Sequence, residues 1–365
     1  MQTNTFPPKR FSVAKMASAV AVAAALLTGT VGAAEAKTYK FAYNIYVGFM
    51  PYGWMEKSGI LDKWAKKYGV DIEIIQVNDY VGGINQFTAG EIDGMAVASM
   101  DGLTIPAASG VDTSIVLAGD FSNGNDGILS KKVSDIKALK GETIHLFELT
   151  VSHYLLSRAL ELNGMSLRDV KTVNITDADI APAYMGSDEI VHAVTWNPML
   201  LQMETKVAGT NRIFDSASTP EEIVDVMLMH TATVKEHPEV AKALVGAWYE
   251  TMAIMNGGDA AAESMIADLA DMSGGSVAEY KAQLDSTKMY YDPAEALDLM
   301  NSKRHQKTWD FVRTFSYDVG LFGEAAASAD FVGIEFPDGT VLGDKGNIQL
   351  RINSSFTEMA VKGEL

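Results

Sequence analysis

The spacing of apolar and polar positions predicts strands and helices that alternate from residue 39 onward. Short apolar runs are typical of buried strands, and amphipathic stretches of nine or so residues are typical of helices. Gly69, Gly90 and Gly110 directly follow helical stretches, where a left-handed C-cap is expected. The pattern predicts a mainly parallel sheet with helices on its faces. Strands are expected at 39–45, 70–77, 92–99 and 114–119, and helices at 60–68, 80–89 and 102–109.

A run of turn-forming residues at 120–127 separates this unit from a second one. The run consists mostly of Gly, Asn, Asp and Ser, which favour turns. The alternation then resumes, so that two α/β units joined by a flexible linker predict two lobes with a cleft between them. In the second unit, strands are expected at 143–147, 171–175 and 191–195, and helices at 152–163, 178–185 and 198–205.

The last part of the chain, beyond Pro220, is predicted to be mainly helical after one more strand at 223–229. This order is expected when the chain crosses to lobe two and returns to complete lobe one, with hinges near 123–127 and 225–231. Two independent α/β domains in series are the alternative. The predicted parts are lobe one at 37–122 and 230–330, lobe two at 128–224, and a C-terminal β-hairpin tail at 331–365.

The first 36 residues are predicted to be a cleavable signal peptide. Lys9, Arg10 and Lys15 precede or flank an apolar run at 16–27, and Ala34 and Ala36 are small residues suited to a cleavage site. The apolar run is short for a membrane span, although an uncleaved signal anchor is the alternative. We therefore expect export to the periplasm without a direct membrane anchor.

Composition excludes several classes of function. The chain has no cysteine, and hence no disulfide, thiol nucleophile, Cys-ligated zinc or lipoprotein anchor. The formal net charge of −18 argues against nucleic acid or anionic lipid as a partner. No HExxH, GxSxG or P-loop sequence occurs, and the six histidines show no metal-ligand spacing. We expect a protein without cofactor or metal that is not an enzyme, with a periplasmic hydrolase as the rival.

Five short segments, at 46–54, 78–80, 119–127, 148–154 and 195–198, carry a family resemblance. Through them the chain resembles the nitrate/taurine-type substrate-binding proteins of ABC importers, and more narrowly the urea-carboxylase-associated periplasmic binding proteins. The resemblance implies an α/β, type II periplasmic binding protein fold with the ligand between the lobes. It also implies the transmembrane subunits of an ABC permease as partner, and guanidine or urea as the ligand.

The charges near the expected cleft independently favour a cation over an anion. Residues 68–130 contain nine acids and no Lys or Arg, and residues 172–205 contain five acids and again no Lys or Arg. Binders of nitrate, sulfonate or carboxylate usually present a basic side chain, although a helix N-terminus can hold an anion without one. A binder of a pyrimidine-type aromatic base remains a further alternative.

The candidate ligand residues lie where strands are predicted to end, because ligands bind at that edge of open α/β sheets. A guanidinium ion needs carboxylates in its plane and an aromatic ring on its face. Asp101 and Asp177 have a helix N-cap as their alternative role, and Asp120 could be a plain turn residue. The predicted ligand-binding residues are Phe49, Trp54, Asp79, Tyr80, Asp101, Asp120, Glu148, His153, Asp177, Trp196 and Asn197.

Overall fold

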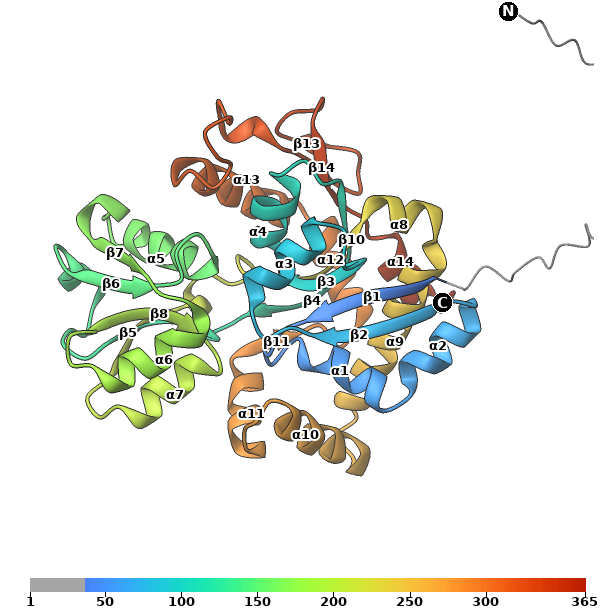
Figure 1. Cartoon of the computed structure of the whole chain (residues 1–365), viewed down its shortest axis with the longest axis horizontal. Coiled ribbons are helices and arrows are strands. Elements are labelled where there is room, and N and C mark those ends of the chain that lie inside the picture. The colour runs from blue at the N-terminus through green and yellow to red at the C-terminus, as the bar shows by residue number, and fades with distance from the viewer. Residues whose placement is uncertain (1–36) are drawn as a thin grey trace, which may run out of the picture. The chain divides into compact units, whose positions relative to one another are not determined.

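The computed structural model describes residues 37–365, and the predicted signal peptide at 1–36 lies outside the described residues. From Thr38 onward the chain forms two β-sheets, each covered by helices, and Figure 1 shows them as two lobes. None of the described helices is long and apolar enough to cross a membrane.

The first lobe is built on a nine-stranded mixed sheet. Its order is β13-β12-β14-β4-β10-β3-β1-β2, and β11 pairs with β4 off this path. The strand β10 runs antiparallel between β3 and β4, whereas β1 is parallel to both β2 and β3. The strands are β1 (Thr38–Tyr43), β2 (Asp71–Gln76), β3 (Gly94–Ala98), β4 (Thr113–Ser122), β10 (Val224–His230), β11 (Thr287–Met289), β12 (Gly333–Glu335), β13 (Val341–Leu342) and β14 (Ile348–Ile352).

The central helix of this lobe, α9, packs against α1, α2, α10 and α14. It begins at Pro238, whose missing N–H costs nothing in a first turn. Its Trp248 is fully buried against Tyr52 and lies so close to Gly119 of β4 that a Cβ there would be 3.1 Å from the indole. The helices of lobe one are α1 (Met50–Lys57), α2 (Ile60–Tyr68), α3 (Tyr80–Thr88), α4 (Ser99–Gly102), α8 (Thr231–Glu236), α9 (Pro238–Met255), α10 (Ala260–Met272), α11 (Val277–Asp285), α12 (Pro293–Asn301), α13 (Lys303–Asp318) and α14 (Ser355–Lys362).

The second lobe, green in Figure 1, is a five-stranded sheet between α5 on one face and α6 and α7 on the other. The α6/α7 face has its own small core, whereas the α5 side is continuous with the main core of the molecule. In the order β7-β6-β8-β5-β9, its strands are β5 (Asp126–Ser130), β6 (Thr143–Leu146), β7 (Lys171–Asn174), β8 (His192–Trp196) and β9 (Asn211–Asp215), and its helices are α5 (Val151–Leu162), α6 (Asp177–Gly186) and α7 (Met199–Lys206).

The chain passes between the lobes twice. The first passage lies between Ser122 and Asp126, and the second between Asp215 and Val224. The predicted second hinge at 225–231 is wrong, because that apolar segment is β10 in the middle of the first sheet. The chain returns to lobe one through the polar stretch before β10, which contains Pro220. Away from the passages, Phe315 of α13 also contacts Tyr154 of α5, with ring centroids 5.2 Å apart.

The predicted C-terminal hairpin over 331–365 is only partly correct. The strands β12 and β13 do pair antiparallel, but β14 lies parallel to both β12 and β4, and the chain ends in the helix α14. The apolar positions of 348–352 fit a strand of either direction, so the sequence pattern alone does not distinguish a hairpin from a strand inserted into the main sheet.

Candidate functional site

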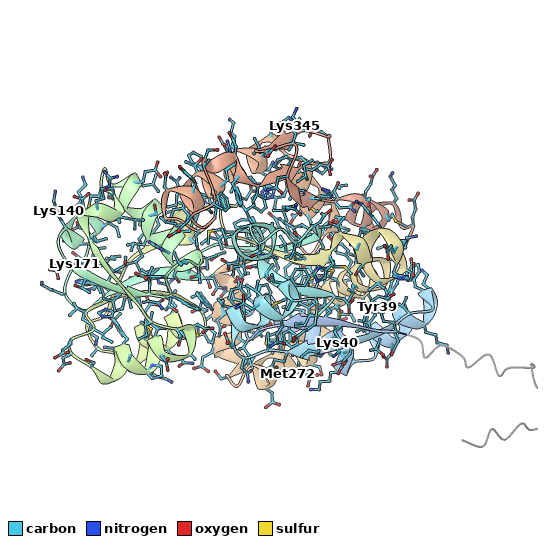
Figure 2. The ribbon with its side chains drawn as sticks, turned by 45° about the horizontal axis from the view of Figure 1, so that its top comes forward. Tyr39, Lys40, Lys140, Lys171, Met272 and Lys345 are labelled. Atoms are coloured by element: carbon cyan, nitrogen blue, oxygen red, sulfur yellow. The ribbon has the colours of Figure 1, made fainter. Side chains whose placement is uncertain are left out.

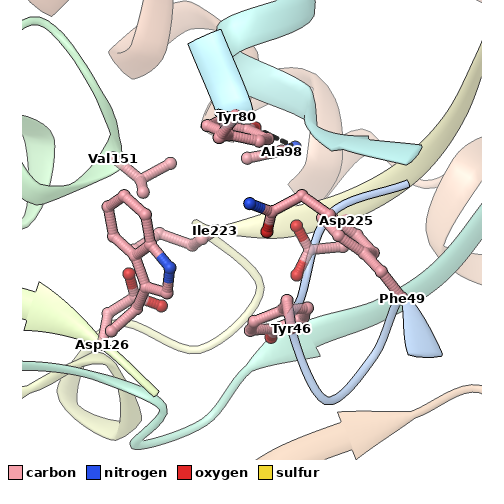
Figure 3. A pocket seen from close by; sticks show the side chains of 10 residues that line it. Tyr46, Phe49, Tyr80, Ala98, Asp126, Val151, Ile223 and Asp225 are labelled. Atoms are coloured by element: carbon pink, nitrogen blue, oxygen red, sulfur yellow. Dashed lines mark hydrogen bonds between the residues drawn. The ribbon is translucent and has the colours of Figure 1, made fainter. Parts of the chain in front are cut away.

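A small cavity lies between the two lobes, and Figure 3 shows its walls. Its volume is about 30 Å³. One water molecule needs about 10–15 Å³, so the cavity suits a ligand of only a few heavy atoms. Lobe one contributes Asn44, Tyr46, Phe49, Tyr80, Ala98 and Asp225, lobe two contributes Asp126, Val151 and Trp196, and Ile223 comes from the second passage.

Four buried carboxyl groups surround this cavity. Asp225 and Asp126 line it from opposite lobes. Asp120 and Asp101 do not line it, but they accept hydrogen bonds from the lining residues Tyr46 and Tyr80. All four are at most 5% exposed, and none of the Lys and Arg residues that the structure describes lines the cavity. Figure 2 shows Lys140 and Lys171 at the outer end of lobe two instead. The described residues contain no cluster of three or more side chains that could hold a metal ion.

Asp120 and Asp225 occupy facing positions on the antiparallel strands β4 and β10. Tyr46 donates a hydrogen bond to Oδ1 of Asp120 at 3.2 Å. A Cβ at position 48 would overlap Oδ2 of Asp120, so glycine is needed there. Burial raises the pKa of Asp120 to about 7, and burial together with the charge of Asp120 raises the pKa of Asp225 well above its ordinary value. A buried carboxylate without a cation is costly, which is the physical cause of both shifts.

Tyr80 connects the cavity wall to Asp101. Its hydroxyl donates to Oδ2 of Asp101 at 2.8 Å and accepts from the backbone N–H of Ala98 at 2.9 Å. Oδ1 of Asp101 has no hydrogen-bond partner among the described residues, and burial raises the pKa of this carboxyl to about 7. Asp101 lies inside α4, where Ala98 is the N-cap, so it does not have the capping role that the sequence offered as an alternative.

On lobe two, Asp126 and Trp196 are direct cross-strand partners on β5 and β8. The register therefore places a carboxyl and an indole side by side at the cavity. Oδ1 of Asp126 has no partner in the described part of the chain, and burial raises the pKa of Asp126 to about 7. Trp196 meets Tyr80 of lobe one edge-on, with ring centroids 6.3 Å apart. The two lobes thus each supply an acid and an aromatic ring.

Two predicted ligand residues of lobe one, Trp54 and Asp79, and one of lobe two, His153, do not line the cavity. The Nε1–H of Trp54 donates to Asp268 at 3.1 Å, because α1 turns that side chain toward α10. Asp79 caps α3 by accepting from the N–H of Gly82. His153 accepts from the backbone N–H of Leu149 and packs edge-on against Phe315 of α13.

Three predicted residues of lobe two are also outside the cavity lining. Glu148 is half-buried, and its backbone N–H donates a hydrogen bond to Oδ1 of Asn174. Asp177 begins α6 and accepts from the N–H of Ala178. The side-chain oxygen of Asn197 accepts a hydrogen bond from the backbone N–H of Leu201 at 2.9 Å. Phe49, Tyr80 and Trp196 do line the cavity.

Sequence reasoning missed Asn44, Tyr46, Asp126 and Asp225 as lining residues. Asp126 falls within the run at 120–127 that predicts turns, but it begins a fully buried strand. The signal for Asp225 was available, because it is the only charged residue in the apolar run at 223–229. A lone acid within a buried strand requires a partner or a ligand.

The two lobes and the cavity between them define a periplasmic-binding-protein fold, and comparison with solved structures confirms it. The alkanesulfonate-binding protein SsuA from Xanthomonas axonopodis pv. citri is 17% identical, with a TM-score of 0.63 over 82% of this chain and 99% of that chain. The nitrate-binding protein NrtA from Synechocystis PCC 6803 is 15% identical, with a TM-score of 0.60 over 81% and 84%. The desulfurization enzyme DSZB, 12% identical, has a TM-score of 0.57 over 90% and 100%.

At the level of sequence, residues 63–256 match the family described as NMT1/THI5 like. The chain belongs to this family. A comparison with curated protein sequences finds no match.

Proposed function

We propose that this protein is the periplasmic substrate-binding component of an ABC importer, and that it captures a small planar cation of the guanidinium class. The observation that carries the choice of ligand is the set of four buried carboxyls around a cavity that no Lys or Arg lines. A cation bound there would supply the missing counter-charge. The family, the fold and the resemblance to importer proteins support the transport role.

The geometry of the cavity fits a guanidinium ion in particular. Asp225 and Asp126 face it from the two lobes and can accept N–H bonds in the ligand plane. The indole of Trp196 and the ring of Tyr80 offer aromatic surface for its faces. Because the two carboxyls belong to different lobes, one cation between them would also hold the lobes together.

The anions named for the structural neighbours fit this cavity poorly. A sulfonate or nitrate would lie against Asp225 and Asp126 with no basic side chain in the lining to offset the repulsion. The cavity of about 30 Å³ is also small for a pyrimidine-type base. The fold alone does not choose the ligand, because one fold hosts many sites.

Urea is the second candidate, and one observation favours it. Burial raises the pKa of Asp126 to about 7, so part of this lining carboxyl is protonated near neutral pH. A protonated carboxyl donates a hydrogen bond, which a urea carbonyl accepts. Urea would therefore bind best at low pH, and guanidinium at high pH.

A ligand panel tests the proposal by thermal unfolding. Guanidinium chloride at millimolar concentration is expected to raise the melting temperature, since a ligand at 100 times its Kd adds about 2.7 kcal/mol to the stability of the folded state. Sodium nitrate, taurine, hydroxymethylpyrimidine and a matched sodium chloride control are expected to give no shift. Stabilisation by nitrate or taurine would contradict the cationic ligand, and a chemically altered ligand recovered after incubation would contradict a purely binding role.

A pair of tryptophan variants tests the aromatic wall. Trp196→Ala is expected to weaken guanidinium binding by about 0.5–2 kcal/mol, the range of a cation–π contact. Trp54→Ala is the matched control, because its indole bonds to Asp268 outside the cavity. Calorimetric titration of both variants gives the comparison. Equal losses of guanidinium affinity in the two variants would show that the indole of Trp196 does not contact the ligand.

A further inference from the structure

The Asp120–Asp225 pair is an unusual feature for the centre of a sheet. The two residues face each other across β4 and β10, and both are at least 95% buried. Only Asp225 reaches the cavity, whereas Asp120 lies behind it under the hydroxyl of Tyr46. A ligand in the cavity can therefore touch Asp225, whereas Asp120 affects the ligand only through Asp225.

Among the described residues, no Lys, Arg or His is a cause of the raised pKa of either carboxyl. Lys288 on β11, the strand that pairs with β4 here, is in an ion pair with Glu295. The nearby carboxyls are Asp126 on β5 and, beyond Tyr80, Asp101 on α4. Burial raises the pKa of every neighbouring tyrosine, so these side chains are neutral hydroxyls. Tyr46 is hydrogen-bonded to Asp120, and the charge of Asp120 or Asp225 contributes to the raised pKa of further tyrosines, which are Tyr52, Tyr80, Tyr280, Tyr290 and Tyr291.

Two negative charges side by side in such surroundings are not tolerated, and one proton shared between the carboxyls removes the repulsion. Directly opposite residues of an antiparallel pair have Cβ atoms about 4.5–5.5 Å apart, which puts a proton shared between the two carboxyls within reach. Oδ2 of Asp120 has no hydrogen-bond partner among the described residues, so it is available to share that proton. A cation bound at Asp225 removes the same repulsion. The proton and the cation therefore compete for one position.

We infer that Asp120 and Asp225 hold one proton between them in the empty site, and that a cation arriving at Asp225 displaces this proton into the solvent. The O–H bond breaks, the proton passes to water or buffer, and the net charge of the site stays the same. Asp120 is then a positioning residue that sets the pH dependence of capture without touching the ligand. This inference rests on the proposed guanidinium-class ligand.

The consequence is selectivity that depends on pH. At pH values where the pair still holds its shared proton, the affinity for a cation should rise about tenfold per pH unit for each proton released. A neutral planar molecule such as urea displaces no proton and gains nothing from the higher pH. A rise in pH therefore shifts the site from neutral ligands toward cations.

Calorimetric titration with guanidinium chloride tests this exchange. The titration is run at one pH in two buffers of different ionisation enthalpy, which gives the number of protons released per ligand bound. For Asp120→Asn we expect about one proton fewer than for the parent, and a flatter pH profile of the Kd. Equal proton release in parent and variant, or none in either, would overturn the exchange.

Tyr46→Phe provides a second variant that keeps both carboxyls. Its loss of the hydrogen bond to Asp120 should make the shared proton harder to remove and shift the affinity profile to higher pH. An unshifted profile with unchanged folding would contradict the inference. If the parent does not bind guanidinium at any pH, the proposed function itself fails, which is a distinct outcome from binding without proton release.

Discussion

Replacing Asp225 with asparagine is expected to weaken guanidinium binding by about 3–5 kcal/mol, because the buried cation then lacks its closest counter-charge. In affinity this is roughly a hundredfold to a few thousandfold. Asp225 lines the cavity and is only 5% exposed, so water cannot screen the loss, and among residues 37–365 no Lys or Arg lines the cavity. Calorimetric titration of parent and variant measures the change directly.

Glu148→Gln is the matched control for this experiment. It makes the same acid-to-amide change on a half-buried side chain that does not line the cavity. We expect its Kd to stay within about twofold of the parent value, since isolated surface charges contribute little. If Glu148→Gln lost as much affinity as Asp225→Asn, the ligand would lie outside the proposed cavity. Thermal melting of both variants verifies that each is folded.

The alternation of strands and helices was predictable from sequence because local patterning determines it. The stretches around β1, α2, β2 and α3 agree with the predicted ranges to within a few residues at each end. The position of β10 was not predictable in this way. Its apolar run indicated a strand, but the sheet that this strand joins depends on its pairing with β3 and β4. Both partners lie far from β10 in the sequence, so local patterning does not reveal the pairing.

The candidate site was predictable in its chemistry more than in its residues. The absence of Lys and Arg from the two cleft-forming stretches already indicated an acidic cavity. The individual acids could not be chosen, because a one-residue change in register turns a side chain to the other face of a sheet. Glu148 and Asp126 both lie near strand ends, yet only Asp126 faces the cavity, beside its cross-strand partner Trp196.

The structural neighbours place this cavity in a wider context. Proteins named for alkanesulfonate and nitrate share the fold at 15–17% identity. At that distance the backbone is retained while the site is free to change. In this chain Asp225 and Asp126 line the cavity from opposite lobes, and the ligand that we propose is opposite in charge to the anions in the names of these neighbours.

Buried carboxylates without a counter-charge destabilise the folded protein, and Asp126→Asn should show this. The pKa of Asp126 is raised to about 7 in the folded state, against 3.8 for an ordinary Asp. A raised folded pKa gives stability that is fully present below the unfolded pKa and is lost as pH rises through the folded pKa. The loss for this group therefore falls between about pH 4 and pH 7, and it amounts to roughly 4 kcal/mol at about 1.36 kcal/mol per unit.

The measurement is the difference in melting temperature between Asp126→Asn and the parent, both without ligand, from about pH 5 to about pH 8. Buried His153, His192 and His305 have lowered pKa values and act in the opposite direction below neutral pH, but they are common to both proteins and cancel in the difference. The asparagine variant should gain about 2–3 kcal/mol on the parent over this range, which is several degrees in melting temperature. A difference that stays constant with pH would mean that Asp126 is already compensated in the empty protein, and a difference that shrinks would reverse the sign of its pKa shift.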